Sequence, residues 1–154
     1  MVDGVSETLS YDALNQLVES SASNGGQEYY VYDASGERVL KRSTSAGTTT
    51  LTAYPFGLQE RTSSGGGRYQ SQIDYDTIAG HLIGWSSGTS TTYDLTDALG
   101  SVVLSFSASA IQGEQLYGPY GNQRYIEGTL GTDKGYTGQL VDAVTGLDYY
   151  NARW

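Results

Sequence analysis

Short stretches of alternating apolar and polar residues recur along the chain, separated by glycine-rich turns. The clearest is residues 68–75 (RYQSQIDY), in which Tyr69, Ile73 and Tyr75 fall on one row and charged or amide residues on the other. Alternation with a period of two is typical of a β-strand that keeps one polar face. No window combines a 3.6-residue apolar period with helix caps. The pattern therefore predicts an all-β protein without a long helix.

The segment 28–43 (EYYVYDASGERVLKRS) predicts a β-hairpin. Aromatic and β-branched residues fill positions 29–32, and these types fit the pleated surface of a sheet. The next four residues have turn chemistry, because Asp33 can accept a hydrogen bond from a backbone N–H two residues on. Gly36 can adopt a positive φ without strain. We expect Gly36 to hold such a φ and a second strand to begin at Arg38.

Units led by tyrosine repeat this hairpin pattern along the chain. The leading tyrosines are separated by 18 to 24 residues, and they are Tyr11, Tyr32, Tyr54, Tyr75, Tyr93 and Tyr117. A period near twenty residues indicates a repeat architecture, and about twenty residues fill one hairpin of ordinary strand length. The sequence therefore predicts consecutive antiparallel β-hairpins that form a twisted ribbon or a partial β-shell. The other predicted strands are 7–11, 16–20, 48–54, 58–62, 80–85, 89–95, 101–106, 111–117 and 123–127.

Composition limits the core and the partners. The 154 residues include 14 Tyr and only 2 Phe, which suits strands whose two faces are both half exposed. The net charge of −9 argues against nucleic-acid binding. No apolar run approaches the ~20 residues that span a bilayer, and the first residues lack the pattern of a signal peptide. The absence of cysteine excludes disulfides and thiolate metal sites.

Several ordered motifs resemble those of one protein family. Residues 96–102 (TDALGSV) and 117–121 (YGPYG) are similar to the TDHLGSV and YDPYG motifs of the RHS repeat-associated core domain. Residues 136–139 (YTGQ) and 142–153 (DAVTGLDYYNAR) resemble its FTGQ…D…TGLYYYGAR signature. The Tyr-Asp pairs resemble the YD repeats of bacterial RHS proteins and teneurins. The resemblance implies a ribbon of β-hairpins that spirals into a hollow shell, which in many members encloses a C-terminal toxin.

On this basis the chain divides into hairpin repeats at 1–127 and a C-terminal signature segment at 128–154. We expect the signature segment to pack on the sheet, because its apolar and aromatic residues would form a sticky patch if exposed; these are Leu147, Tyr149, Tyr150 and Trp154. The positions with predicted structural turn or signature roles are Asp12, Asp33, Gly36, Asp76, Asp97, Gly100, Pro119, Gly121, Gly138, Gly146 and Arg153.

Two patterns that could indicate catalysis have simpler interpretations. Residues 84–88 (GWSSG) fit the G-x-S-x-G pattern of hydrolases, which needs a strand-turn-helix context and a histidine after the serine. The only histidine, His81, precedes the serine. Asp74 and Asp76 share one face of a predicted strand, as an acid–base pair could. A solvated strand position and a turn aspartate explain them better.

Asp133, Asp142 and Asp148 are the candidates for a calcium site built with loop carbonyls. Their spacing is not that of an EF-hand loop. We therefore expect no catalytic residue, no metal site and no cofactor.

Aromatic residues form the candidate binding surface. Side chains of this kind stack on sugar rings, and the candidates are Tyr30, Tyr32, Trp85, Tyr149 and Tyr150. Cross-strand packing that stabilises the sheet is the preferred interpretation, because aromatic residues must replace the missing aliphatic ones.

The predicted function is structural: an extracellular or cell-surface β-ribbon scaffold that is not an enzyme. An open ribbon leaves unpaired backbone groups at its edge strands, so we expect head-to-tail self-association into an oligomer or filament. Two alternatives are a carbohydrate-binding or adhesive module that takes polysaccharide, and the remnant of a toxin-encapsulating shell. Because the sequence begins within a repeat and stops within the signature, we also expect a processed or excised part of a longer protein.

Overall fold

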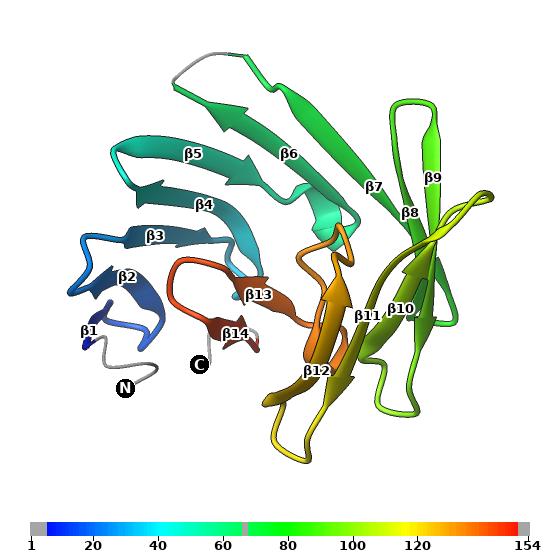
Figure 1. Ribbon diagram of the computed structural model, residues 1–154. Coiled ribbons are helices and arrows are strands. Elements are labelled where there is room, and N and C mark those ends of the chain that lie inside the picture. Colours follow the sequence, from blue (N-terminus) through cyan, green and yellow to red (C-terminus); the bar gives the residue numbers. More distant parts are fainter. Residues whose placement is uncertain (1–5, 66–67, 151–154) are drawn as a thin grey trace. The chain divides into compact units, whose positions relative to one another are not determined.

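The computed structural model describes residues 6–65 and 68–150, and these form an all-β protein (Figure 1). The predicted fold class is confirmed. The strands are β1 (Glu7–Tyr11), β2 (Leu17–Ala22), β3 (Gln27–Tyr32), β4 (Arg38–Ser45), β5 (Thr48–Ala53), β6 (Gln59–Ser64), β7 (Ser71–Ile78), β8 (His81–Ser87), β9 (Ser90–Thr96), β10 (Val102–Phe106), β11 (Ile111–Tyr117), β12 (Gln123–Gly128), β13 (Leu140–Asp142) and β14 (Leu147–Tyr149). Two short 3₁₀ turns, η1 (Pro55–Gly57) and η2 (Tyr136–Gly138), complete the assigned elements.

The strands β1 to β12 form one sheet in which each strand follows its neighbour in sequence order. Neighbouring strands are antiparallel, as in β1–β2, β3–β4 and β8–β9, which is the arrangement that short hairpin connections permit. β13 and β14 pair in a separate two-stranded sheet. β1 and β12 stand at the two ends of the strand order, so the large sheet is open. Within the described ranges, no helix has the length and apolar character needed to cross a membrane.

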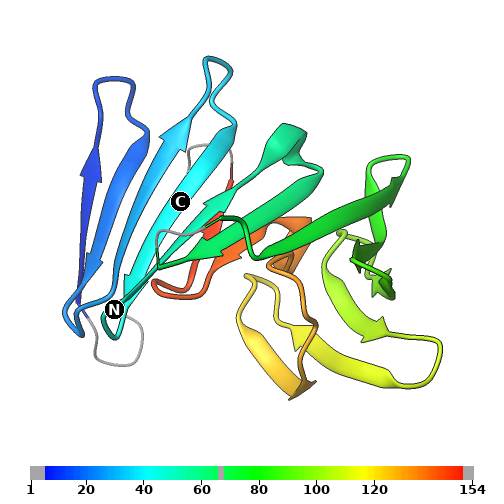
Figure 2. The ribbon, with the colours of Figure 1, turned by 90° about the horizontal axis from the view of Figure 1, so that it is seen from above.

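The chain forms two compact units. The first contains Met1–Gln72 and Asp142–Trp154, and the second contains Ile73–Val141. These bounds follow tertiary packing, whereas the sequence boundary at 127/128 separates repeats from signature motifs. Within the first unit, β14 lies against the hairpin of β3 and β4 (Figures 1 and 2).

The turn at Asp33 has the predicted chemistry. Asp33 Oδ1 accepts hydrogen bonds from the backbone N–H groups of Ser35 (2.8 Å) and Glu37 (3.0 Å), and the Asp33 N–H donates to the Glu37 carbonyl (2.9 Å). The Ser35 hydroxyl, followed by these N–H groups, lowers the pKa of Asp33. Gly36 has a φ of 88°, which confirms the prediction for this residue. Beyond the Asp33–Glu37 closure, the β3–β4 register shifts by one residue between Val31 and Tyr32.

The same turn recurs at Asp12 and Asp97. Each carboxylate accepts hydrogen bonds from the N–H groups two and four residues on, at 2.8 to 2.9 Å. The fourth residue of each turn has a positive φ, 60° at Asn15 and 85° at Gly100. Three hairpins of the repeat therefore share one local design, which the sequence Asp-x-x-Gly or Asp-x-x-Asn encodes.

The remaining predicted positions divide between turns and strands. Pro119 lies in a turn in which the Gly118 N–H donates to the Asn122 carbonyl (2.8 Å). Positive φ angles of 81°, 71° and 71° occur at Gly121, Gly138 and Gly146. Arg153 lies outside the described residues.

Asp76 is a correction to the predicted turn positions. It lies within β7, opposite Gly84, and not in a turn. The connection between β7 and β8 is instead the two-residue turn at Ala79 and Gly80, whose φ angles are 52° and 82°. Two consecutive positive φ angles are characteristic of the tight hairpin turn whose twist matches the flanking strands, so this hairpin extends two residues beyond its aspartate.

Replacing Gly36 by valine should lower the free energy of unfolding by about 1–2 kcal/mol, because a β-branched residue resists the left-handed region. A Cβ at this position would come no closer than 3.5 Å to another atom, Gln16 Nε2, so the loss would report backbone strain. Gly36→Asn is the matched control, since asparagine tolerates this region and Asn15 holds the same place in the Asp12 turn. Urea unfolding measures both variants. Equal midpoints for Gly36→Val and the wild type would contradict the prediction.

The buried positions of the first unit are largely polar. Glu28 and Tyr30 are buried at alternate positions of β3, with Tyr32 half-buried next in the row. Further buried residues in this unit are the polar or charged Ser20, Arg38, Lys41, Thr52, Glu60, Ser63, Asp142 and Thr145, beside Leu17, Ala22, Tyr54 and Tyr149. Composition predicted two half-exposed faces. The structure differs, because one row of positions on these strands is almost fully buried.

The second unit has a small apolar core. Tyr75, Leu82, Val102 and Leu130 form its buried cluster. Ile73 and Trp85 are partly buried against this cluster.

Candidate functional site

A network of buried charged side chains joins β4 to the end of β13 in the first unit. Asp142 is fully buried and accepts hydrogen bonds from Arg38 Nη1 and Lys41 Nζ, each at 2.7 Å. The side chains of the two cations are 1% and 8% exposed. One carboxylate therefore binds two buried cations, one through each of its oxygens.

Glu28 is the second carboxylate of the network, and its side chain is 1% exposed. Its Oε1 lies 3.9 Å from Lys41 Nζ, and its Oε2 accepts a hydrogen bond from the Tyr30 hydroxyl (3.1 Å). Burial, and after it the charge of Asp142, raise the pKa of Glu28. The network contains two cations and two carboxylates, whose mutual attraction offsets part of the cost of desolvating them.

Aromatic rings enclose the Arg38 guanidinium. Its central carbon lies 4.8 Å from the Tyr54 ring centroid, 4.7 Å from that of Tyr149 and 5.6 Å from that of Tyr30. Cations at such distances are attracted to the ring faces. The Tyr149 hydroxyl also accepts a hydrogen bond from the Arg38 backbone N–H (2.8 Å) and donates to the Gly36 carbonyl (2.9 Å). Tyr149 therefore fastens β14 to the start of β4.

A bulge in β4 brings Arg38 and Lys41 to the same side. Strict alternation places residues three apart on opposite faces of a sheet. The register pairs Tyr32 with Arg38 and Tyr30 with Lys41, so β4 contains one residue more than β3 over this stretch. The extra residue restores both cations to the face that carries Glu28.

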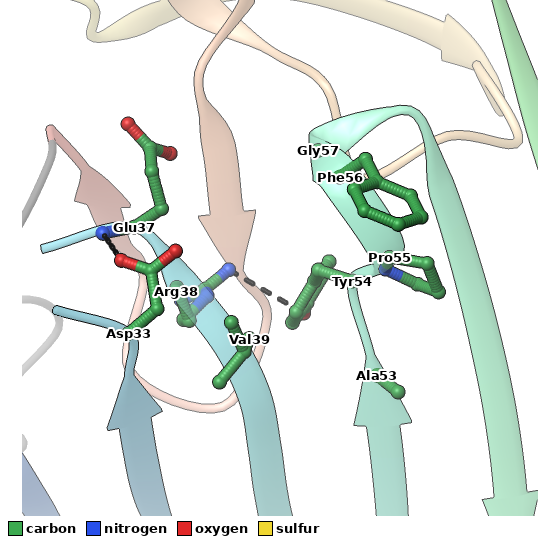
Figure 3. A pocket seen from close by; sticks show the side chains of 9 residues that line it. All are labelled: Asp33, Glu37, Arg38, Val39, Ala53, Tyr54, Pro55, Phe56 and Gly57. Carbon is green, nitrogen blue, oxygen red and sulfur yellow. Dashed lines mark hydrogen bonds between the residues drawn. The ribbon is translucent and has the colours of Figure 1, made fainter. Parts of the chain in front are cut away.

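A groove of about 560 Å³ lies between the Asp33 turn and η1 (Figure 3). Figure 3 shows Asp33 and Glu37 on one side and the Phe56 ring on the other, with Arg38 between Asp33 and Tyr54. Phe56 is 96% exposed. The complete lining is Asp33, Glu37, Arg38, Val39, Ala53, Tyr54, Pro55, Phe56 and Gly57. Arg38 is thus shared by the groove and the buried network.

The five aromatic residues considered for sugar stacking do not form an exposed platform. Tyr30 and Tyr149 are 3% and 4% exposed, so neither presents a ring face to a ligand; they enclose Arg38 instead. Tyr32 stacks against Tyr149, with ring centroids 6.1 Å apart. Trp85 packs against the apolar core of the second unit. Tyr150 alone of the five is exposed, at 39%.

Most residues of the patterns weighed for catalysis and metal binding lie in strands β7, β8, β13 and β14. Ser86 lies within β8 and is followed by β9, whereas a nucleophile elbow is followed by a helix. Asp74 and Asp76 lie in β7 opposite Ser86 and Gly84. Asp142 is engaged by the two cations. Within residues 6–65 and 68–150, no three His, Asp or Glu side chains gather as a metal site would require.

Sequence reasoning missed the buried network. It assigned positions 38–42 to a strand, and it considered Asp142 as a calcium ligand and as the first residue of a signature motif. The available signal was the row of Glu28, Tyr30 and Tyr32 at alternate positions of one strand. A charged residue on an aromatic row needs a buried partner, but the sequence does not show which residue supplies it.

The fold of this chain is similar to parts of several solved structures. No protein-family model matches the chain, and no curated protein matches it. A chain of the Photorhabdus luminescens Tc holotoxin pore with mutated TccC3 matches 99% of this chain with a TM-score of 0.77 and 22% identity. Chains in crystal structures of TcdB2-TccC3 and TcdB2-TccC3-Cdc42 each match 96%, with TM-scores of 0.78 and 0.75 and identities of 20% and 23%.

This chain spans only 8% of the length of each of those neighbours. At identities below 25% the likeness concerns the fold, and it supports an RHS-like fold.

Proposed function

We propose that this chain is a structural segment of an RHS-type β-hairpin scaffold. The observation that carries the proposal is the sheet β1–β12, in which hairpins follow one another in strict sequence order. The likeness in fold to chains of a holotoxin over nearly the whole sequence supports it. In such a segment the buried network serves to hold hairpins and C-terminal strands together. An extracellular or cell-surface location belongs to the proposal, because the structural neighbours are parts of a toxin.

The edge strands are the proposed assembly surfaces. β12 is exposed at every one of its positions and ends the strand order of the sheet. A strand in that place presents backbone N–H and C=O groups that can pair with another strand. Its occupant is either the first strand of a second copy, as self-association requires, or further repeats of a longer shell.

Light scattering across a dilution series, with negative-stain microscopy, tests self-association. Ile126 in β12 and Ile78 at the end of β7 are 54% and 64% exposed. Lysine at either position therefore adds the same charge and should change the folding stability to a similar extent. We expect Ile126→Lys to reduce association, because charge blunts an edge strand, and Ile78→Lys to leave it unchanged. A wild-type protein that stays strictly monomeric at high concentration would rule out self-association through these edges.

A further inference from the structure

Lys41 and Asp142 are 101 positions apart in the sequence and meet inside the first unit. Lys41 Nζ lies 2.7 Å from Asp142 Oδ1, with the Asp142 side chain fully buried and that of Lys41 8% exposed. We propose that this pair condenses to a side-chain amide, an isopeptide bond between Lys41 Nζ and Asp142 Cγ. The bond is a self-catalysed modification that covalently joins β4 to β13.

The pair is held in a geometry that favours reaction. A nitrogen in hydrogen-bond contact with a carboxylate oxygen stands about 3–3.5 Å from the carboxyl carbon, the separation at which positioned groups react. Lys41 is fixed on a strand that pairs on both sides, with Tyr30 in β3 and Thr52 in β5. Asp142 is fixed by its second contact to Arg38. Two groups held in this way react at an effective concentration far above any in solution.

The step balances without an external reagent. A proton passes from the Lys41 ammonium to the Asp142 carboxylate, directly or through Glu28, whose Oε1 lies 3.9 Å from Lys41 Nζ. The neutral amine attacks Asp142 Cγ and the C–N bond forms. One carboxyl oxygen then leaves as water and takes the two protons that the ammonium gives up. An ammonium and a carboxylate become one amide and one water, with no oxidant, reductant or cofactor.

Arg38 and Glu28 have separate parts in this step. Arg38 Nη1 donates to Asp142 Oδ2 at 2.7 Å, the oxygen that Lys41 does not contact, and a donor there stabilises the negative charge of the tetrahedral intermediate. Glu28 Oε1 lies 3.9 Å from Lys41 Nζ, and burial raises the pKa of this carboxyl group, which favours its taking up a proton from Lys41. After condensation Arg38 and Glu28 remain, and because one charge of each sign is removed, the net charge of the site does not change.

Burial favours the amide over the ion pair. Keeping separate charges out of water is costly, and the condensation removes two of them, one of each sign. The Asp142 side chain is fully buried and that of Lys41 is 8% exposed, which limits access of the water that would hydrolyse the product. The inference rests on these contacts and does not depend on the scaffold function.

Intact mass of the denatured wild-type protein is the direct test. We expect a mass lower than that of the sequence by one water molecule, after allowance for removal of Met1. Trypsin cannot cleave after an amidated lysine, so the digest should contain residues 39–42 joined to residues 135–153. Fragmentation of that product should place the link at Lys41 and Asp142. A wild-type protein that keeps its full mass after long incubation at neutral pH, and so holds an ion pair only, would overturn the proposal.

Variants separate the bond from a structural role of the same residues. Lys41→Arg keeps the cation without the amine, and should restore the full mass. Asp142→Asn should lose ammonia in place of water, because the leaving group changes. Glu28→Gln, checked for folding by circular dichroism, should form the bond more slowly, which a purely structural role would not cause. Lys134→Arg is the control, and its mass should still be lower than that of its sequence by one water molecule. A loss of water that persists in Lys41→Arg would place the dehydration elsewhere and overturn the proposal.

Discussion

Replacing Asp142 by alanine should lower the free energy of unfolding by at least about 3–5 kcal/mol, the usual cost of removing one partner from a buried ion network. The substitution leaves the guanidinium of Arg38 and the ammonium of Lys41 buried, at 1% and 8% exposure. Glu28 lies 3.9 Å from Lys41 and cannot replace both contacts. If Asp142 also carries the covalent link to Lys41, the loss will be larger. Urea unfolding measures the effect.

Asp148→Asn is the control for this substitution. Asp148 lies in β14 on the same C-terminal segment, and burial followed by the charge of Asp142 raises its pKa. Neutralising Asp148 removes a repulsion and should leave the unfolding midpoint unchanged or slightly higher. A loss below about 1 kcal/mol for Asp142→Ala would show that the network contributes no more than an exposed ion pair.

Asp94→Asn should change stability in a manner that depends on pH. Asp94 is 5% exposed, and burial raises its pKa from 3.8 to about 6, against the opposing hydrogen bond from the Ser105 hydroxyl. Above pH 6 the folded protein holds a buried charge that the unfolded chain keeps in water. That cost disappears as the pH falls from 6 to 3.8, because the folded state then takes up the proton first. The stability of the variant minus that of the wild type should therefore be about 2–3 kcal/mol more favourable at pH 8 than at pH 4.

The pH comparison removes the other effects of the amide. Any hydrogen bond that asparagine fails to make is lost at both pH values, so only the titration of Asp94 remains in the difference. Asp76→Asn removes one charge from an exposed position of β7 in the same unit and reports the effect of net charge alone. A stability difference between Asp94→Asn and the wild type that is equal at pH 4 and pH 8 would contradict the assignment.

The hairpins and their turns could be predicted because their causes are local. The Asp33 carboxylate binds N–H groups two and four residues on, so the turn forms from contacts within five consecutive residues. Alternation of residue type then identifies the strands on either side. The prediction was wrong for Asp76, because a Tyr-Asp pair also occurs inside a strand when a two-residue turn follows later in the sequence. A short motif alone does not distinguish these two cases.

The sequence by itself determined an all-β chain of consecutive hairpins, the positive φ of Gly36 and the resemblance in its C-terminal motifs. Tertiary structure alone decided which charges are buried. Asp142 meets Lys41 across 101 positions, and Arg38 joins them only because a bulge adds one residue to β4. Alternation assigns a side chain to a face but not to a partner, because partners on distant segments depend on how the chain folds back after Val141. The site therefore became visible only when packing had brought Asp142 and β14 onto β3 and β4.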